Sequence, residues 1–216
     1  MHQCNFFDWQ IMSFQPAQIP NNDNKRVEAV HRADVIEEID SKLYEIFCFL
    51  AKEITGCPVS WTGVIDSEKQ VMLARDGFPD DVPNEMPRNQ TLCQFALERK
   101  QPLVINNMVK DTRFRYHPAV TDFGVRFYAA FPIVTSDGYT LGTLCVSDNK
   151  VRKLTKHKIS LLMGLATKLA YQLEVQVSQR KGTAESTIHI LNKLLLKYPD
   201  LKVLEAISVL KFIIKD

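Results

Sequence analysis

The feature that most constrains this fold is a pair of apolar, β-rich runs between residues 125 and 148, separated by the dipeptide Asp137-Gly138. Asp-Gly readily adopts the positive φ angles of a tight hairpin turn. Residues 125–135 and 141–146 are therefore predicted to be neighbouring antiparallel strands. The centre of the chain is thus predicted to be part of an antiparallel sheet.

Two long amphipathic helices are predicted, one before and one after the strand-forming residues, because apolar side chains recur there at three- and four-residue steps. The first spans about residues 25–55 and ends at Gly56 and Pro58. The second spans about residues 155–179 and starts at Thr155, a residue type suited to capping a helix N-terminus.

Shorter apolar runs between these helices predict further strands. The segment that contains Pro79, Pro83 and Pro87 is too rich in proline for regular structure, and residues 106–124 show no clean period. The order of elements predicts an α+β domain in which the first and last helices pack on the same face of one antiparallel sheet. The additional strands are predicted at residues 59–65, 71–74 and 103–105, and a short helix is predicted at residues 92–99.

The chain is predicted to have three parts. Residues 1–24 form an irregular N-terminal arm, because prolines and a polar run break any regular element. Residues 25–181 form the α+β domain. Residues 182–216 form a C-terminal helical extension, in which two apolar stripes are separated at Tyr198-Pro199-Asp200.

Composition and charge exclude several classes of function. Lys and Arg number 27 and Asp and Glu number 25, and they are interspersed, so the chain has no basic block for nucleic acid and no basic helix face for a membrane surface. No apolar run reaches the ~20 residues of a membrane span, and the N-terminus does not resemble a signal peptide. The five cysteines include no CxxC pair and no histidine at ligand spacing. We expect a cytoplasmic protein without a metal site.

Residues 91–174 contain, in order, the segment LCQFALERK, the PLVI strand, the DTRF segment, the hairpin that ends in LGTLCVSD, and the RKLT turn before the long closing helix. With these motifs, residues 91–174 resemble the GAF domain family. GAF domains are small-molecule-sensing and dimerising modules of signalling proteins. The resemblance implies a sheet of about five or six strands, an unidentified small-molecule ligand, a homodimer and a separate signalling protein as a partner. It names neither the ligand nor a cofactor.

A ligand pocket is predicted between the sheet and residues 106–124. Asp111 and Arg113 are candidate polar groups for an anionic ligand, since the Arg guanidinium offers a rigid fork to a carboxylate or phosphate. The alternative is an ion pair that fixes the loop. Aromatic side chains are dense enough to form the pocket wall, and the alternative for them is ordinary core. These aromatic residues are Phe114, Tyr116, Phe123, Phe127 and Tyr128.

Cys93 is the candidate reactive thiol and the remaining predicted ligand-site residue. It lies just inside the N-terminus of the predicted helix 92–99, where the helix dipole lowers a thiol pKa. The alternative is a buried, inert cysteine, and Cys145 in the hairpin is interpreted as structural. Free methionine-sulfoxide reductases share the GAF fold and use several cysteines, but their FPGH-type loop is replaced here by DTRFRYHPAV.

The sequence therefore predicts a small-molecule-sensing, dimerising GAF module that carries no output domain and no catalytic residues of its own. The signature NKxFDE of cyclic-nucleotide-binding GAF domains and the Cys-His pair of bilin-binding ones are both absent. Two alternatives are kept. One is a thiol oxidoreductase of the methionine-sulfoxide type centred on Cys93, and the other is a dimerisation adaptor that binds no ligand.

Overall fold

The computed structural model describes residues 13–33, 36 and 41–178. A six-stranded sheet with the order β3-β2-β1-β6-β5-β4 lies at its centre, and every neighbouring pair of strands is antiparallel. This confirms the predicted α+β fold. The strands are β1 (Val59–Ile65), β2 (Lys69–Asp76), β3 (Glu85–Pro87), β4 (Leu103–Ile105), β5 (Phe127–Val134) and β6 (Thr140–Asp148).

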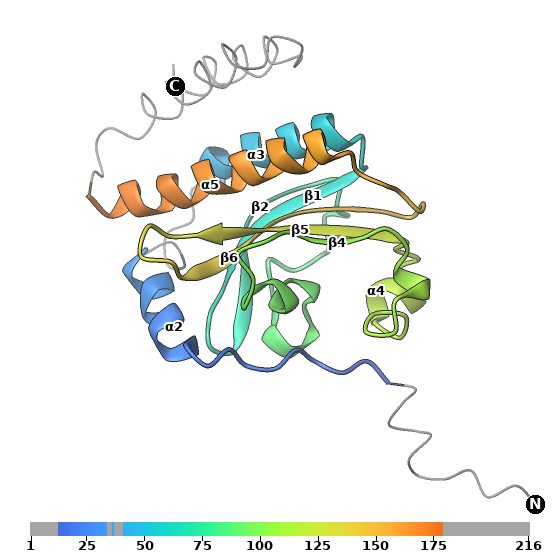
Figure 1. Cartoon of the computed structure of the whole chain (residues 1–216), viewed down its shortest axis with the longest axis horizontal. Helices are drawn as coiled ribbons and strands as arrows, with labels where there is room; N and C mark the ends of the chain where they lie inside the picture. The colour runs from blue at the N-terminus through green and yellow to red at the C-terminus, as the bar shows by residue number, and fades with distance from the viewer. Residues whose placement is uncertain (1–12, 34–35, 37–40, 179–216) are drawn as a thin grey trace, which may run out of the picture.

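The two long helices, α3 (Lys42–Thr55) and α5 (Lys156–Ser178), lie side by side on one face of the sheet, as predicted (Figure 1). Short elements cover the opposite face. The Thr155 hydroxyl accepts a hydrogen bond from the Lys158 backbone N–H at 3.2 Å and so caps α5. The short elements are the 3₁₀ helices η1 (Arg88–Gln90), η2 (Leu92–Ala96) and η3 (Met108–Lys110) and the single turn α4 (Pro118–Thr121).

The predicted central hairpin is formed by β5 and β6. Gly138 has a φ of 88°, and its backbone N–H donates to the Thr135 carbonyl at 2.9 Å. Gly142 in β6 lies so close to β1 that a Cβ atom there would be 2.0 Å from the Gly63 carbonyl oxygen. Pro132 is compatible with β5 because the pairing of β5 with β4 covers only residues 128–130.

The sheet is buried on both faces, and all nine residues of β6 are buried. We call the two apolar layers the helix-face core and the loop-face core. The helix-face core lies under α3 and α5 and includes Phe47, Leu50, Phe131, Leu144 and Leu169. The loop-face core lies under the short helices and includes Trp61, Met72, Cys93, Phe114, Tyr128 and Cys145.

The single helix predicted over residues 25–55 is wrong. The structure has two helices there, α2 (Asp23–Arg32) and α3. The buried side of α2 lies against β1 and β6 at the end of the sheet, whereas α3 packs across the sheet face (Figure 1). One straight helix cannot lie against both surfaces, so tertiary packing overrides the continuous apolar period.

Two smaller expectations are also corrected. Part of the proline-rich segment forms the edge strand β3, in which Pro87 occupies an edge position that needs no N–H. The predicted helix 92–99 is the five-residue 3₁₀ helix η2. The predicted C-terminal extension lies outside the described residues, and the three-part division of the chain stays a prediction.

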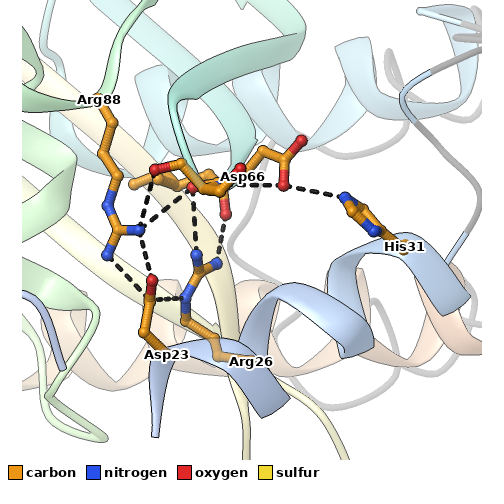
Figure 2. A network of polar contacts seen from close by, with 7 residues as sticks. Asp23, Arg26, His31, Asp66 and Arg88 are labelled. Atoms are coloured by element: carbon orange, nitrogen blue, oxygen red, sulfur yellow. Dashed lines mark hydrogen bonds and ion pairs between the residues drawn. The ribbon is translucent and has the colours of Figure 1, made fainter. Parts of the chain in front are cut away.

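A buried charge network joins α2 to the β1–β2 turn and to η1 (Figure 2). Asp23 accepts hydrogen bonds from Arg26 Nε at 2.7 Å and from Arg88 Nη1 and Nη2 at 2.6 and 2.8 Å. Both guanidinium groups also donate to backbone carbonyls of the turn: Arg26 to Ile65, and both arginines to Asp66. The side chain of Arg26 is 1% exposed and that of Arg88 is 9% exposed.

Each charge in this network has a partner, which makes its burial tolerable. Burial acts to raise the pKa of Asp23, but the hydrogen bonds from Arg88 and Arg26 outweigh it and hold the pKa below its usual value. The network therefore holds the N-terminus of α2 against the turn that ends β1. His31, further along α2, adds an exposed contact to the Asp66 carboxylate at 2.9 Å.

The described part of the N-terminal arm, residues 13–20, runs past η2 and α4 on the loop face (Figure 1). The ring of Phe14 meets the His117 ring edge-on, with 4.4 Å between centroids. His117 caps α4: its Nδ1 accepts the Ala119 backbone N–H at 3.0 Å, and its Nε2 donates to the Gln90 carbonyl at 2.9 Å. This pattern requires a neutral ring, and burial lowers the pKa of His117 although the bond to Gln90 opposes the shift.

Removing one member of the buried charge network is expected to destabilise the fold strongly. Arg26→Met leaves Asp23 with less compensation and removes the donor of the Ile65 carbonyl, so we expect a loss of about 3–5 kcal/mol in the free energy of unfolding. Urea denaturation measures it. Arg32→Met, at an exposed pair with Asp137, is the control and is expected to cost no more than about 1 kcal/mol. Equal losses for the two variants would contradict a structural role for the network.

The neutral cap at His117 predicts a pH dependence. Because the folded state disfavours the protonated ring, stability is complete above the unfolded pKa of about 6.5 and falls as pH drops toward the lower folded pKa. His117→Asn retains a capping acceptor and removes the titration. Between about pH 7 and about pH 5, the variant's free energy of unfolding is expected to fall less than the wild type's. The difference in slope is at most about 1.4 kcal/mol per pH unit, the value for one proton. Parallel curves from urea denaturation would refute this.

Candidate functional site

Helix η2 places Cys93 against the sheet. Thr91 caps the helix by accepting the Cys93 backbone N–H at 3.2 Å, and its carbonyl accepts Gln94 Nε2 at 2.8 Å. The Thr91 hydroxyl also donates to the side chain of Gln70 on β2. Side-chain hydrogen bonds rather than a long helical ladder therefore hold this five-residue helix in place.

Cys93 and Cys145 form a buried thiol pair. Their Sγ atoms are 3.5 Å apart, and their side chains are 1% and 0% exposed. The Tyr128 hydroxyl lies 3.4 Å from Cys93 Sγ and 3.3 Å from Cys145 Sγ, and Cys145 Sγ is 3.0 Å from Thr143 Oγ1. Cys145 was interpreted as structural, and no motif in the sequence pairs it with Cys93. Two thiols, a phenol and a hydroxyl therefore meet inside the loop-face core.

The surroundings shift the pKa values of the two thiols in opposite directions. Burial acts to raise the pKa of Cys93, but hydrogen bonds from Cys145, Thr143 and Tyr128 outweigh it and bring the pKa below its usual value. Burial, together with the neighbouring Cys93, raises the pKa of Cys145. The arrangement therefore favours negative charge on Cys93 and a proton on Cys145. Because the pair shares its hydrogen bonds, the two titrations are coupled.

The structure does not gather the predicted aromatic wall into one place. Phe114 and Tyr128 are fully buried in the loop-face core. Phe127, the residue before Tyr128 in β5, faces the other side and belongs to the helix-face core, since successive strand residues alternate. Phe123 is 77% exposed, and Tyr116 is half-buried with the Arg115 guanidinium 4.9 Å from its ring centroid. A ligand role for these residues stays a prediction.

Asp111 and Arg113 pair with each other. Arg113 Nε and Nη2 donate to the two carboxylate oxygens of Asp111 at 2.9 and 2.6 Å, and the Arg113 backbone N–H donates to Oδ1 at 3.0 Å. The hydrogen bond from Arg113 is the main cause that lowers the pKa of Asp111. The guanidinium also lies 4.7 Å from the centroid of the Phe114 ring. This geometry matches the alternative of an ion pair that fixes the loop.

A cavity of about 500 Å³ lies between the arm and the outer side of η2, and we call it the arm cavity. One wall is the arm, which is held by a hydrogen bond from the Ala17 backbone N–H to Gln94 Oε1 at 3.0 Å. The other wall presents an aromatic ring, an amide, one carboxylate and two guanidinium groups. These groups belong to Phe95, Gln94, Glu98, Arg99 and Arg113, beside Thr112.

The arm cavity was not predicted from the sequence, although Arg113 was among the candidate site residues. The arm residues that line it, from Ser13 to Gln18, carry no motif, and their placement depends on contacts with η2, some 77 residues away for the Ala17–Gln94 bond. Phe14 was the available signal, because an aromatic residue in a proline-rich arm is suited to anchoring that arm.

Two negative findings hold for the described residues. Among residues 13–33, 36 and 41–178, no three His, Cys, Asp or Glu side chains are grouped so as to hold a metal ion. Within the same ranges, no helix combines the length and apolar character needed to cross a membrane. The cytoplasmic location stays a prediction.

Comparison with known proteins agrees with the architecture. Residues 42–173 match the sequence model of the GAF domain. A segment of 145 residues is 28% identical to a cyclic di-GMP phosphodiesterase of Pseudomonas aeruginosa and covers 66% of this chain but only 24% of that protein. The chain thus spans about a quarter of that relative's length.

Solved structures show the same fold at low sequence identity. The GAF domain of a phosphoenolpyruvate-protein phosphotransferase from Acinetobacter superposes with a TM-score of 0.54 at 13% identity, over 81% of this chain and 96% of that one. A type II free methionine-R-sulfoxide reductase from Thermoplasma acidophilum superposes with a TM-score of 0.52 at 15% identity, over 62% and 92%. With a family match over residues 42–173 and the six-stranded sheet between helices and short loops, this chain belongs to the GAF domain family.

Proposed function

We propose that this GAF domain is a sensory module that binds a small anionic molecule in the arm cavity. The observation that carries the proposal is the cavity itself, because its volume of about 500 Å³ suits a small molecule and charged, amide and aromatic groups line it together. The site lies on the outer side of η2. The sequence had predicted a pocket between the sheet and residues 106–124, where Phe114 and Tyr128 are packed as core.

The lining suggests the chemical class of the ligand. Arg99 and Arg113 supply two positive charges, and Arg113 keeps Nη1 for a ligand after it donates Nε and Nη2 to Asp111. Guanidinium groups favour carboxylates and phosphates because their planar donors match two oxygens at once. The ring of Phe95 offers an apolar surface for the remainder of the molecule. A small carboxylate or phosphate ester with an apolar or planar body fits this set.

Contacts of the cavity wall offer a route from the ligand to the rest of the domain. Gln94 accepts the Ala17 N–H on the arm and donates to the Thr91 carbonyl that begins η2. The arm leads directly into α2, whose first turn carries Asp23 of the buried charge network. A ligand that tightens the arm against η2 therefore acts on both α2 and η2. We propose that a separate signalling protein reads this change.

A 145-residue segment of this chain is similar to part of a cyclic di-GMP phosphodiesterase, and this similarity supports a role in signalling. The shared segment is about a quarter of that enzyme. Methionine-sulfoxide reduction is the second candidate, and the nearby thiols of Cys93 and Cys145 favour it. Cys93 is 1% exposed and is not among the residues that line the arm cavity, so a free sulfoxide has no site beside it there. Sensing is the better supported function.

We also propose a homodimer formed through the outer face of α5. Residues 160–167 of this helix carry no charged side chain, and Ser160, Thr167 and Tyr171 on its outer side are exposed. These three exposed side chains carry no charge, so a second copy of α5 can cover them without burying a charge. Apart from the two neighbouring residues and the adjoining backbone of α5 itself, no atom of the described residues lies within 4 Å of the position that a Cβ would take at Gly164. A second helix can therefore approach closely at this point.

Arg99→Gln tests the ligand site. The variant loses one cationic donor from an exposed position, so we expect unchanged folding but binding of small carboxylates and phosphates weakened about tenfold or more. Isothermal titration with a panel of such compounds measures it. Arg32→Gln, an exposed arginine paired with Asp137 instead, is the matched control and should bind as the wild type does. Equal affinity for the two variants contradicts the site, and a panel without any binder favours the ligand-free adaptor.

Gly164→Arg tests the dimer. The open space around Gly164 means that the long side chain does not disturb the monomer, but its bulk and charge prevent close approach of a second α5. We expect light scattering to give a dimeric mass for the wild type and a monomeric mass for the variant. Gly164→Ala is the control, which should remain dimeric and gain about 0.5–1 kcal/mol from helix propensity. A wild type that is monomeric at micromolar concentration, or a variant that stays dimeric, would falsify this interface.

A further inference from the structure

We propose that Cys93 and Cys145 are a redox site that interconverts between two thiols and one disulfide. The site takes a small two-electron oxidant of the peroxide class, and a cellular thiol restores it. This chemistry is separate from the arm cavity, because neither cysteine lines that cavity. It also needs no sulfoxide substrate.

The sulfur atoms of Cys93 and Cys145 lie close enough to form a disulfide after a small movement. They are 3.5 Å apart, and a disulfide bond is about 2.05 Å long, so the two atoms must approach by about 1.5 Å. Cys145 is held firmly, since it pairs with Trp61 on one side and Ala130 on the other. Cys93 lies on the short 3₁₀ helix η2, which belongs to no strand pair of the sheet. The required movement therefore falls on η2.

The polar groups around the pair stabilise a thiolate on Cys93. The Tyr128 hydroxyl donates to Cys93 Sγ at 3.4 Å, and the Thr91 side chain caps η2 at the Cys93 N–H. Groups that donate to a sulfur atom stabilise its thiolate, which is the nucleophilic form. Cys145 lies within reach as the second sulfur. Cys93 is thus the attacking thiol and Cys145 the resolving one.

The reaction balances in two steps. The Cys93 thiolate attacks one peroxide oxygen, the O–O bond breaks, and the departing oxygen takes a proton and leaves as water, so that a sulfenic acid remains on Cys93. The Cys145 sulfur then attacks the Cys93 sulfur, the S–O bond breaks, and a second water leaves with the Cys145 proton. Two thiols have lost two electrons and the peroxide has gained them. A thiol reductant reverses the change by thiol–disulfide exchange.

Disulfide formation has a structural consequence in the arm. Gln94 follows Cys93 directly and holds the arm through Ala17. A shift of η2 toward the sheet therefore moves the hydrogen bond that positions residues 13–18. Oxidation is expected to change the arm cavity without a direct contact between the thiols and a ligand.

The chain contains internal controls for the reaction. Cys48 and Cys57 are also buried, with 0% and 3% of their surfaces exposed. Burial raises the pKa of Cys48 to about 12, and burial likewise raises the pKa of Cys57. Burial without a neighbouring thiol keeps such groups protonated and unreactive. Oxidation under native conditions should therefore distinguish them from Cys93 and Cys145.

Non-reducing tryptic mapping of the full-length protein after dilute hydrogen peroxide tests the proposal. We expect the peptides 89–99 and 127–150 to be joined through Cys93 and Cys145 and to separate after dithiothreitol. Far-ultraviolet circular dichroism, recorded during oxidation, shows whether the protein is folded when the bond forms. Cys93→Ser and Cys145→Ser should each lose the joined peptide, and Cys48→Ser should keep it.

Three results would overturn the redox site. One is a joined peptide that forms only after urea unfolds the chain. Another is Cys93 oxidised to sulfinic acid without a link to Cys145. The third is a wild type in which both thiols resist peroxide as Cys48 does. If a serine variant fails to fold, the wild-type map, its reversal by dithiothreitol and the folded-state spectrum still decide between these results and the proposal.

Discussion

Burial of the central sheet on both faces is the constraint on which the rest of the structure depends. All nine residues of β6 are buried, so neither face can be left to solvent. Two long helices cover one face and satisfy their own backbone groups. The other face is covered by short helices and loops, whose N–H and C=O groups lack such ladders and need side-chain partners. Thr91, Asn107 and His117 each accept a backbone N–H at the start of one of these short helices.

The same need explains why charge is buried on this side of the domain. Arg26 and Arg88 bind the carbonyls of the β1–β2 turn, and Asp23 compensates their charge. The loop layer therefore contains a cavity and a thiol pair within a short distance of the sheet, whereas most side chains buried under α3 and α5 are apolar. We infer that the loop layer carries the chemistry of this protein and that α5 carries its association. Each layer can then be altered by variants that leave the other intact.

Elements that follow a local period were predictable from the sequence. The strand at residues 59–65 and the strand at residues 103–105 have the predicted bounds, and Asp137-Gly138 placed the central hairpin. The break between α2 and α3 was not predictable, because the apolar period runs through it and only the docking of α2 at the end of the sheet requires the break. The edge strand β3 was missed because its prolines indicate a loop.

The candidate site was less predictable, for reasons that differ among its residues. Strand alternation was sufficient to separate Phe127 from Tyr128, which lie on opposite faces. Cys93 contacts Cys145, and the arm contacts η2. Both contacts join residues that are far apart in the sequence, so no local sequence pattern predicts them. Arg113 was identified correctly as a polar group of this region, but its partner Asp111 occupies two of its donors.

The measurement that most directly tests the account is chemical-shift mapping of the ¹⁵N-labelled protein with small carboxylates and phosphates. Binding in the arm cavity is expected to shift the amide signals of residues 15–18, 94–99 and 112–113, which line or adjoin it. Shifts concentrated instead at Tyr128, Thr143 and Cys145, inside the loop-face core, would contradict it. They would place the ligand on the sheet side of η2, nearer to the pocket predicted from the sequence between the sheet and residues 106–124.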